Sequence, residues 1–225
     1  VYPGHVKTVM WTHPSHEEVR ILKGTGFSYE ARGLILSDHG PTHVDALNHI
    51  STAPDARAII DFPPEDFLTP GVCLDVTARL LEKYIRRQDL EEALRRHKLE
   101  VRGGDTVLLW TANYERHYGR NGNRDWLYRY PGLDREGTEF LADAGVLNIG
   151  VDAPSIDNWQ DPTYPAHSVC RDRSLLNTEN LCNLGWVAGR RFIYCGMPLR
   201  IVDGTGSPIR ALALFSGALG YPYQG

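Results

Sequence analysis

The sequence predicts a single α/β domain, spanning residues 1–225, that is built on a mixed β-sheet. The length of 225 residues suits one ordinary domain, and the contents of 42% hydrophobic and 23% charged residues are those of a folded globular chain. Strand-like and helix-like segments are interspersed but do not alternate strictly, which favours a mixed sheet over a doubly wound parallel one.

The elements of the first half are predicted from apolar runs and cap signals. The first thirty residues are polar, and we expect them to be irregular. The segments 33–38 and 71–77 are short apolar runs typical of strands. Residues 77–97 are predicted as a helix in two pieces, the second started by a capping box formed by Asp89 and Glu92.

In the second half of the sequence, the signals for strands and helices are clearer. A turn at Gly103 leads into a buried strand that ends at Thr111, and a helix is expected between an N-cap at Asp134 and a terminating Gly145. A strand followed by a loop is predicted over 146–157. The segments 190–196 and 199–214 are expected to hold late strands, the last two joined through residues 203–208.

Composition excludes several classes of function. With 24 Lys and Arg against 28 Asp and Glu, the net charge of −4 gives no basic footprint for nucleic acid. No apolar run approaches the roughly 20 residues of a membrane helix. The four cysteines form no CxxC pair, so we expect free thiols, a reducing compartment and a cytoplasmic protein. The first residue is Val1, so an earlier segment, including a cleaved signal peptide, stays open.

The segment 37–50, SDHGPTHVDALNHI, holds the candidate chemistry: His39, His43, Asp45 and His49. In a strand, His43 and Asp45 would share one face at about 6.6 Å, close enough to share an ion, whereas His39 needs a bend, which Gly40 and the next proline supply. A helical conformation would instead place residues that are four apart on one face. Around His49, the extended and the helical conformation both stay open. Imidazole with carboxylate suits Zn²⁺ or Mn²⁺. A solvated polar loop is the alternative, and a metal site would need ligands from a second segment.

The same residues resemble a known family, the cyclase-like metal hydrolases, which include bacterial kynurenine formamidases and isatin hydrolases. The family pattern H-x-G-T-H-x-D-x-P-x-H is matched over residues 39–49, except that Pro41 replaces its glycine and Leu47 its proline. A second motif is also similar: GVDAPSID at 150–157 precedes His167, and Glu179 follows twelve residues later within ENLCNL. Two motifs in the same order, within a likeness that covers nearly the whole chain, make the resemblance specific.

The resemblance implies a swivelling β/β/α fold, in homodimers or homotetramers, with one or two divalent ions, Zn or Mn. It assigns metal ligation to five residues and bridging to Asp45 if two ions bind; the five are His39, His43, Asp45, His167 and Glu179. His49 matches the catalytic histidine. Trp159 and Tyr164 lie between the two parts of the second motif, so we expect them at the mouth of the site, where they would contact the substrate.

The function that follows is hydrolysis of the C–N bond of a small amide or cyclic amide, of the aryl formamide or isatin type. A metal-bound water would be the nucleophile, with His49 as acid and base. No G-x-S-x-G elbow or phosphate loop offers another route. A lactone or ester hydrolase with the same site, and a metal-binding protein without catalysis, remain the alternatives.

Overall fold

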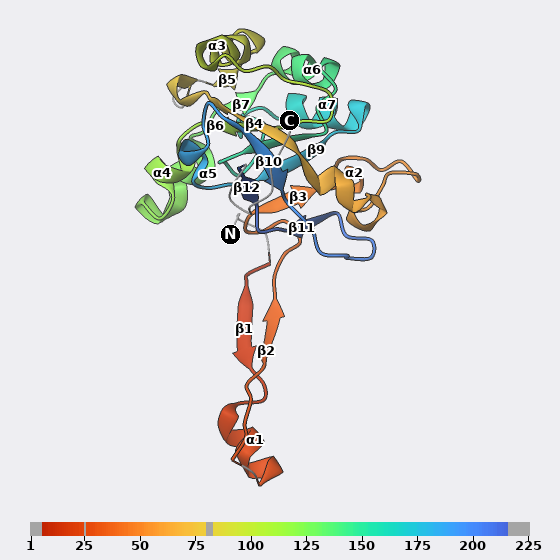
Figure 1. Ribbon diagram of the computed structural model, residues 1–225, viewed down its shortest axis with the longest axis vertical. Helices are drawn as coiled ribbons and strands as arrows, with labels where there is room; N and C mark the ends of the chain where they lie inside the picture. The colour runs from red at the N-terminus through yellow and green to blue at the C-terminus, as the bar shows by residue number, and fades with distance from the viewer. Residues whose placement is uncertain (1–5, 25, 80–82, 216–225) are drawn as a thin grey trace.

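An eight-stranded mixed sheet organises the chain in the computed structural model, which describes residues 6–24, 26–79 and 83–215 (Figure 1). Its strand order is β11-β3-β9-β8-β6-β4-β10-β12. The four central strands run parallel, and the two outer strands at each end are antiparallel to their neighbours. The predicted mixed sheet is therefore confirmed. Its strands are β3 (His43–Asp45), β4 (Leu68–Asp75), β6 (Thr106–Trp110), β8 (Asn148–Val151), β9 (Leu176–Glu179), β10 (Arg191–Cys195), β11 (Gly206–Pro208) and β12 (Leu212–Leu214).

Two small two-stranded sheets and a set of helices complete the structure. The small sheets are β1 (Val9–Thr12) with β2 (Arg32–Ile35), and β5 (Tyr84–Ile85) with β7 (Gly132–Leu133). The α-helices are α1 (His16–Lys23), α2 (Leu47–Ile50), α3 (Arg87–His97), α4 (Asn113–His117), α5 (Arg124–Tyr128), α6 (Arg135–Asp143) and α7 (Pro165–Arg173). The 3₁₀ turns are η1 (Ile59–Asp61), η2 (Pro64–Phe67), η3 (Thr77–Arg79), η4 (Asn121–Asn123) and η5 (Leu184–Trp186).

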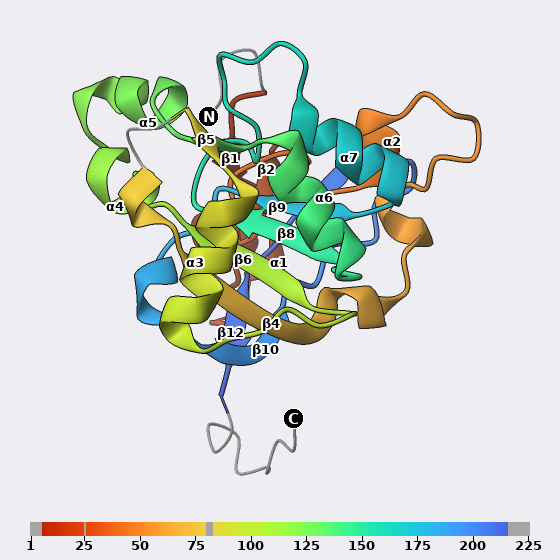
Figure 2. The same ribbon diagram turned by 90° about the horizontal axis from the view of Figure 1, so that it is seen from above.

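One face of the sheet is covered by α3, α6 and α7, which lie in front of the parallel strands in Figure 2. The main core forms between them, because the parallel strands are apolar on this face and each helix turns an apolar stripe inward; Leu74, Leu90, Leu141 and Val169 are among its buried side chains. A second cluster around Phe192 and η5 covers the opposite face.

Several predicted elements are confirmed because their signals are local. Asp134 caps α6 by accepting a hydrogen bond of 2.8 Å from the amide of Gly137, and the chain leaves the helix through Gly145 at φ +80°. The predicted strands at 71–77 and 103–111 are β4 and β6, and the strand expected over 146–157 is β8.

Within residues 77–97 the prediction is partly wrong. Tyr84–Ile85 is a strand, because it pairs with β7, and helix α3 begins only at Arg87. Asp89 is not the N-cap but the third helical residue, whose carboxylate accepts from the amide of Arg86 at 2.8 Å. Residues 80–82 of the first expected helical piece lie outside the described residues.

The two ends of the chain also differ from expectation. The N-terminal stretch is not irregular: it contains β1 and α1, and the strand predicted at 33–38 is β2, which ends before the histidine cluster. The late strands do not pair through residues 203–208. Instead β11 lies within that segment and pairs with β3, while β12 pairs with β10 at the other end of the sheet.

All four cysteines are free thiols, as predicted; they are Cys73, Cys170, Cys182 and Cys195. Among the described residues, no helix combines the length and apolar character needed to cross a bilayer.

Candidate metal centre

Strand β3 brings the first motif into the sheet. It is inserted between β9 and β11, so His43 and Asp45 share one face while Val44 packs into the core on the other. The predicted shared face is confirmed, and so is the bend before it: the chain turns at Gly40 and Pro41, which are joined by a cis peptide bond.

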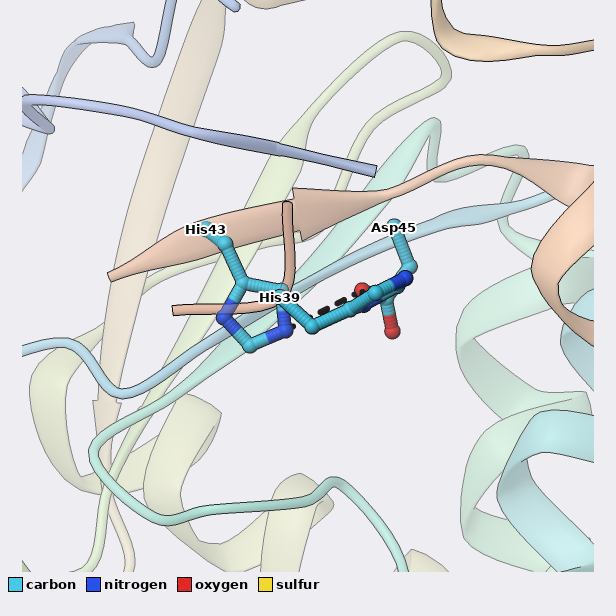
Figure 3. A group of neighbouring side chains, drawn as sticks. All are labelled: His39, His43 and Asp45. Carbon is cyan, nitrogen blue, oxygen red and sulfur yellow. Dashed lines mark hydrogen bonds and ion pairs between the residues drawn. The ribbon is translucent and has the colours of Figure 1, made fainter. Parts of the chain in front are cut away.

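Two imidazole nitrogens meet at one oxygen of Asp45, which makes a group of three possible ligand atoms. Its Oδ1 lies 2.8 Å from Nδ1 of His39 and 3.2 Å from Nε2 of His43, and Figure 3 shows the two rings converging on the carboxylate. A tetrahedral ion about 2.0–2.2 Å from each ligand needs donor atoms roughly 3.3–3.6 Å apart. The His43 pair is close to this spacing, whereas His39 stands at hydrogen-bond distance from Asp45 and would move outward by about half an ångström to admit an ion; the three ligand atoms lie within 4.8 Å of one another.

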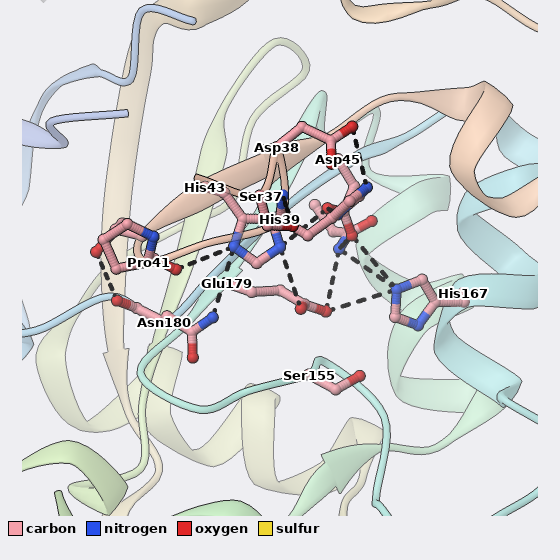
Figure 4. Close-up of polar contacts among 12 residues, drawn as sticks. Ser37, Asp38, His39, Pro41, His43, Asp45, Ser155, His167, Glu179 and Asn180 are labelled. Atoms are coloured by element: carbon pink, nitrogen blue, oxygen red, sulfur yellow. Dashed lines mark hydrogen bonds and ion pairs between the residues drawn. The ribbon is translucent and has the colours of Figure 1, made fainter. Parts of the chain in front are cut away.

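The other oxygen of Asp45 belongs to a second group. Its Oδ2 lies 3.7 Å from Nε2 of His167, which is 3.5 Å from Oε1 of Glu179. Strand pairing sets His43 opposite Glu179, and their side chains approach to 3.6 Å. The two groups thus share Asp45, one oxygen each, and Figure 4 shows the five side chains facing one another.

Each histidine is held from outside by its second ring nitrogen. Nε2 of His39 lies 2.8 Å from the hydroxyl of Thr205, which donates to Asp38. Nδ1 of His43 donates to the carbonyl of Pro41 at 3.1 Å. Nδ1 of His167 lies 2.5 Å from Oδ2 of Asp157. Such outer partners fix the ring orientation of metal-binding histidines and leave the inner nitrogen free to bind.

The cluster buries negative charge, and the pKa values of its ionisable side chains shift to balance that charge. Burial alone would lower the pKa of both inner histidines, but Asp45 and Glu179 raise that of His43 to about 9, and Asp157, Asp45 and Glu179 raise that of His167 to about 10. Burial and the charge of Asp45 raise the pKa of Glu179 to about 7. Although burial opposes it, the histidines hold the pKa of Asp45 well below its usual range. A divalent cation would replace the protons that this cluster otherwise carries.

His49 lies beside the cluster without joining it. It sits in α2, with its ring centroid 4.0 Å from that of His39 and 6.3 Å from that of His167. It belongs to neither of the two groups with metal-binding spacing in the described chain. Removal from water lowers its pKa, and His39, His167 and His43 add to this effect against the attraction of Asp45.

A cavity of about 620 Å³ opens over these residues, within the usual range for a small-ligand site. His39, His43, His49, His167 and Glu179 line it. Trp159 and Tyr164, expected at the mouth, also line it and are exposed. Of the two departures from the family pattern, Pro41 lines the cavity, whereas Leu47 is buried in the core beside Ile59.

Three supporting residues had no predicted role. Asp157 and Thr205 hold histidines from outside, as described above. Asn177 donates from Nδ2 to Asp45 at 2.7 Å and to Glu179 at 3.4 Å, while its Oδ1 is buried with no hydrogen-bond partner. Asp157 stands inside the quoted motif GVDAPSID, a signal that could have suggested a role; nothing local marks Thr205 or Asn177.

Comparison with known proteins agrees with this architecture. A kynurenine formamidase of Salinibacter ruber is 29% identical over 215 residues, covering 94% of this chain and 90% of the relative. A kynurenine formamidase of Bacillus anthracis is 29% identical over 223 residues, covering 92% and 98%. Isatin hydrolase A of Labrenzia aggregata shares the fold, with a TM-score of 0.78 at 21% identity over 93% of this chain and 84% of that one.

The family model described as "Putative cyclase" matches residues 4–158. This range includes β3 and His49, and it ends just before α7 and β9 supply the remaining candidate ligands. Since the match covers more than half of the sequence, the chain belongs to the cyclase family.

Proposed function

We propose that this protein is a metal-dependent hydrolase that cleaves the C–N bond of a small amide or cyclic amide. The observation that carries the proposal is the pair of ligand groups sharing Asp45 at the wall of a cavity that also exposes His49. The kynurenine formamidases among its relatives support the amide as the bond class.

The five candidate ligands would hold one or two divalent ions, Zn²⁺ or Mn²⁺, with Asp45 offering one oxygen to each group. A bound ion would supply a water of lowered pKa and would polarise the amide carbonyl. The outer partners Thr205, Pro41 and Asp157 keep the imidazoles pointing inward, so the ligand geometry is set before an ion arrives.

His49 is the proposed proton carrier. Its lowered pKa leaves the imidazole neutral at pH 7, so it can accept a proton when water attacks the carbonyl. The nitrogen that leaves the cleaved bond needs a proton, and the imidazolium can return it. Because His49 lies outside both ligand groups, this role does not compete with metal binding.

The cavity wall favours a planar, aromatic substrate. Besides Trp159 and Tyr164, four more aromatic side chains line it: Tyr114, Tyr118, Trp126 and Tyr130. Ring faces stack on flat substrates and add to the binding energy beyond burial alone. We propose Trp159 and Tyr164 as substrate contacts at the open end.

Two measurements test the proposal. A panel of N-formylkynurenine, isatin, cyclic imides and aromatic lactones is assayed with protein reconstituted with Zn²⁺ or Mn²⁺. Amide turnover supports the proposal; turnover of lactones alone would reassign the substrate class, and none with full metal loading would indicate a binding protein. The variant His49→Ala should retain metal and lose about 10²–10⁴-fold in turnover. Unchanged turnover would remove His49 from the mechanism.

A further inference from the structure

A second cavity adjoins the one that opens over the candidate ligands, and the indole of Trp159 lines both. The second cavity has a volume of about 700 Å³. Its lining residues are Asn121, Arg124, Asp125, Tyr128, Arg129 and Trp159. Apart from Trp159, none of these residues takes part in the proposed hydrolysis, so their arrangement calls for an explanation of its own.

The shared wall between the two cavities is held in place from two sides. The rings of Tyr128 and Trp159 meet edge to face, with centroids 5.3 Å apart. The neighbouring Asn158 donates from Nδ2 to the carbonyl of Lys83 at 2.9 Å and to that of Tyr130 at 3.1 Å. A substrate that lies over the candidate ligands and extends past the indole therefore reaches the second cavity.

The second cavity has an excess of positive charge. Nη1 of Arg129 lies 3.8 Å from Oδ1 of Asp125, which is an ion pair but too long for a hydrogen bond. Among the described residues, no carboxylate lies within ion-pair distance of Arg124. One acidic side chain thus faces two guanidinium groups, and the guanidinium of Arg124 is available to a ligand.

The basic character extends beyond the cavity. The segment 113–129, which contains α4, η4 and α5, carries four arginines and two acidic side chains in a chain whose net charge is −4. Helices α4 and α5 lie together at one side of the molecule (Figure 1 and Figure 2). Burial lowers the pKa of His117, at the end of α4, and the charges of three of these arginines lower it further, against the attraction of Asp125. A positive surface beside a cavity raises the local concentration of small anions.

The lining indicates which anion fits. A guanidinium group is planar and binds a carboxylate through two parallel hydrogen bonds. The rings of Tyr128 and Trp159 offer faces and edges to a flat apolar body. A zwitterion fits less well, because Asp125, which would face an ammonium group, already pairs with Arg129.

We propose that the second cavity is a carboxylate subsite, so that the protein selects aromatic amides whose ring carries a negative charge that no ammonium group offsets. The amide part of this statement rests on the proposed function. Binding of the anion depends only on the lining residues, so it can be measured without turnover.

The first test measures binding to metal-free protein, in which no ion can hold the carboxylate. Calorimetry compares 4-acetamidobenzoate with 4-acetamidobenzamide, which has nearly the same shape without the charge. The acid should bind at least about tenfold more tightly, and its affinity should fall severalfold between about 0.05 M and about 0.5 M NaCl, while that of the amide stays constant. The zwitterion 4-acetamidophenylalanine should bind less tightly than the acid.

The variant Arg124→Ala should lower the affinity for the acid about tenfold and leave that for the neutral amide unchanged. Arg124→Lys, which keeps the charge but not the planar fork, should fall between the two. The matched control is Arg135→Ala, because Arg135 is also exposed and pairs one turn along its helix, with Glu139 at 3.2 Å, but lines neither cavity.

The second test measures turnover by metal-loaded protein of 4-formamidobenzoate and its neutral counterpart 4-formamidobenzamide. Arg124→Ala should raise KM for the acid about tenfold with kcat unchanged, since the contact is present before and during the reaction. If neither compound is hydrolysed while metal-free binding still depends on Arg124, the proposed function fails and the subsite is supported. The subsite is overturned if the acid binds no more tightly than the neutral amide or the zwitterion, or if Arg124→Ala keeps the full preference.

Discussion

The hydrogen bond between Asp157 and His167 makes a quantitative prediction for the variant Asp157→Asn. Oδ2 of Asp157 accepts from Nδ1 of His167 at 2.5 Å and from its amide at 3.1 Å, while Oδ1 accepts from the amide of Ala166 at 2.6 Å. An asparagine can keep the oxygen toward Ala166, but its NH₂ then faces two donors of His167. The imidazole would lose its partner and the preference for a proton on Nδ1.

The magnitude follows from that single bond. Hydrogen bonds to a charged group contribute about 1.5–3 kcal/mol, and 1.4 kcal/mol is about tenfold in an equilibrium constant. We therefore expect metal affinity to fall by about 10–100-fold, the usual range for outer partners of metal-binding histidines. Titration of metal-free protein with Zn²⁺ against a competing chelator measures this.

Asp134→Asn is the matched control, because Asp134 also accepts from helix amides but lies at the start of α6 and contacts no candidate ligand. It should leave metal affinity unchanged. The reasoning is refuted if Asp157→Asn binds metal like the natural protein while His167→Ala does not.

Three further predictions concern the centre and its surroundings. The raised pKa values of His43 and His167 stabilise the metal-free fold fully below pH about 6.5, and this contribution is lost as pH rises through about 9 and 10. Metal binding needs neutral imidazoles, so calorimetry in paired buffers should detect proton release and an affinity that rises up to tenfold per pH unit for each proton. Gly132→Ala should destabilise the fold by about 1–3 kcal/mol in chemical denaturation, because its Cβ would overlap the neighbouring loop backbone, whereas Gly103→Ala meets no atom closer than 3.8 Å and should not. Trp159→Ala should raise KM for aryl amides by about tenfold with little change for an aliphatic amide, and equal effects on both would contradict a stacking role.

The elements that sequence predicts best are those whose signals are local. Helix α6 has its cap and its terminating glycine within the segment, and β6 is an apolar run in a parallel sheet. Tyr84–Ile85 looks helical because its strand identity depends on β7, nearly fifty residues away. Helix α1 was recoverable, since Ser15 and Glu18 form the spacing of a capping box.

The residues of the candidate site also separate into those with a local sequence signal and those without one. The shared face of His43 and Asp45 follows from strand periodicity, and the bend at Gly40 was expected from residue type. The partners His167 and Glu179 came from resemblance to a family rather than from spacing. Thr205 could not be found at all, because its contact with His39 bridges 166 positions and depends on β11 lying beside β3.

The carboxylate of Asp157 also determines how this site could be grafted onto another protein. It accepts hydrogen bonds from the first amides of α7 and from the imidazole of His167. The same carboxylate therefore fixes the start of that helix and the orientation of that ligand. A graft of the five ligand positions alone would leave the imidazole free to turn. The transferable unit is the whole segment 157–167, with Gly132 beneath it to admit the backbone.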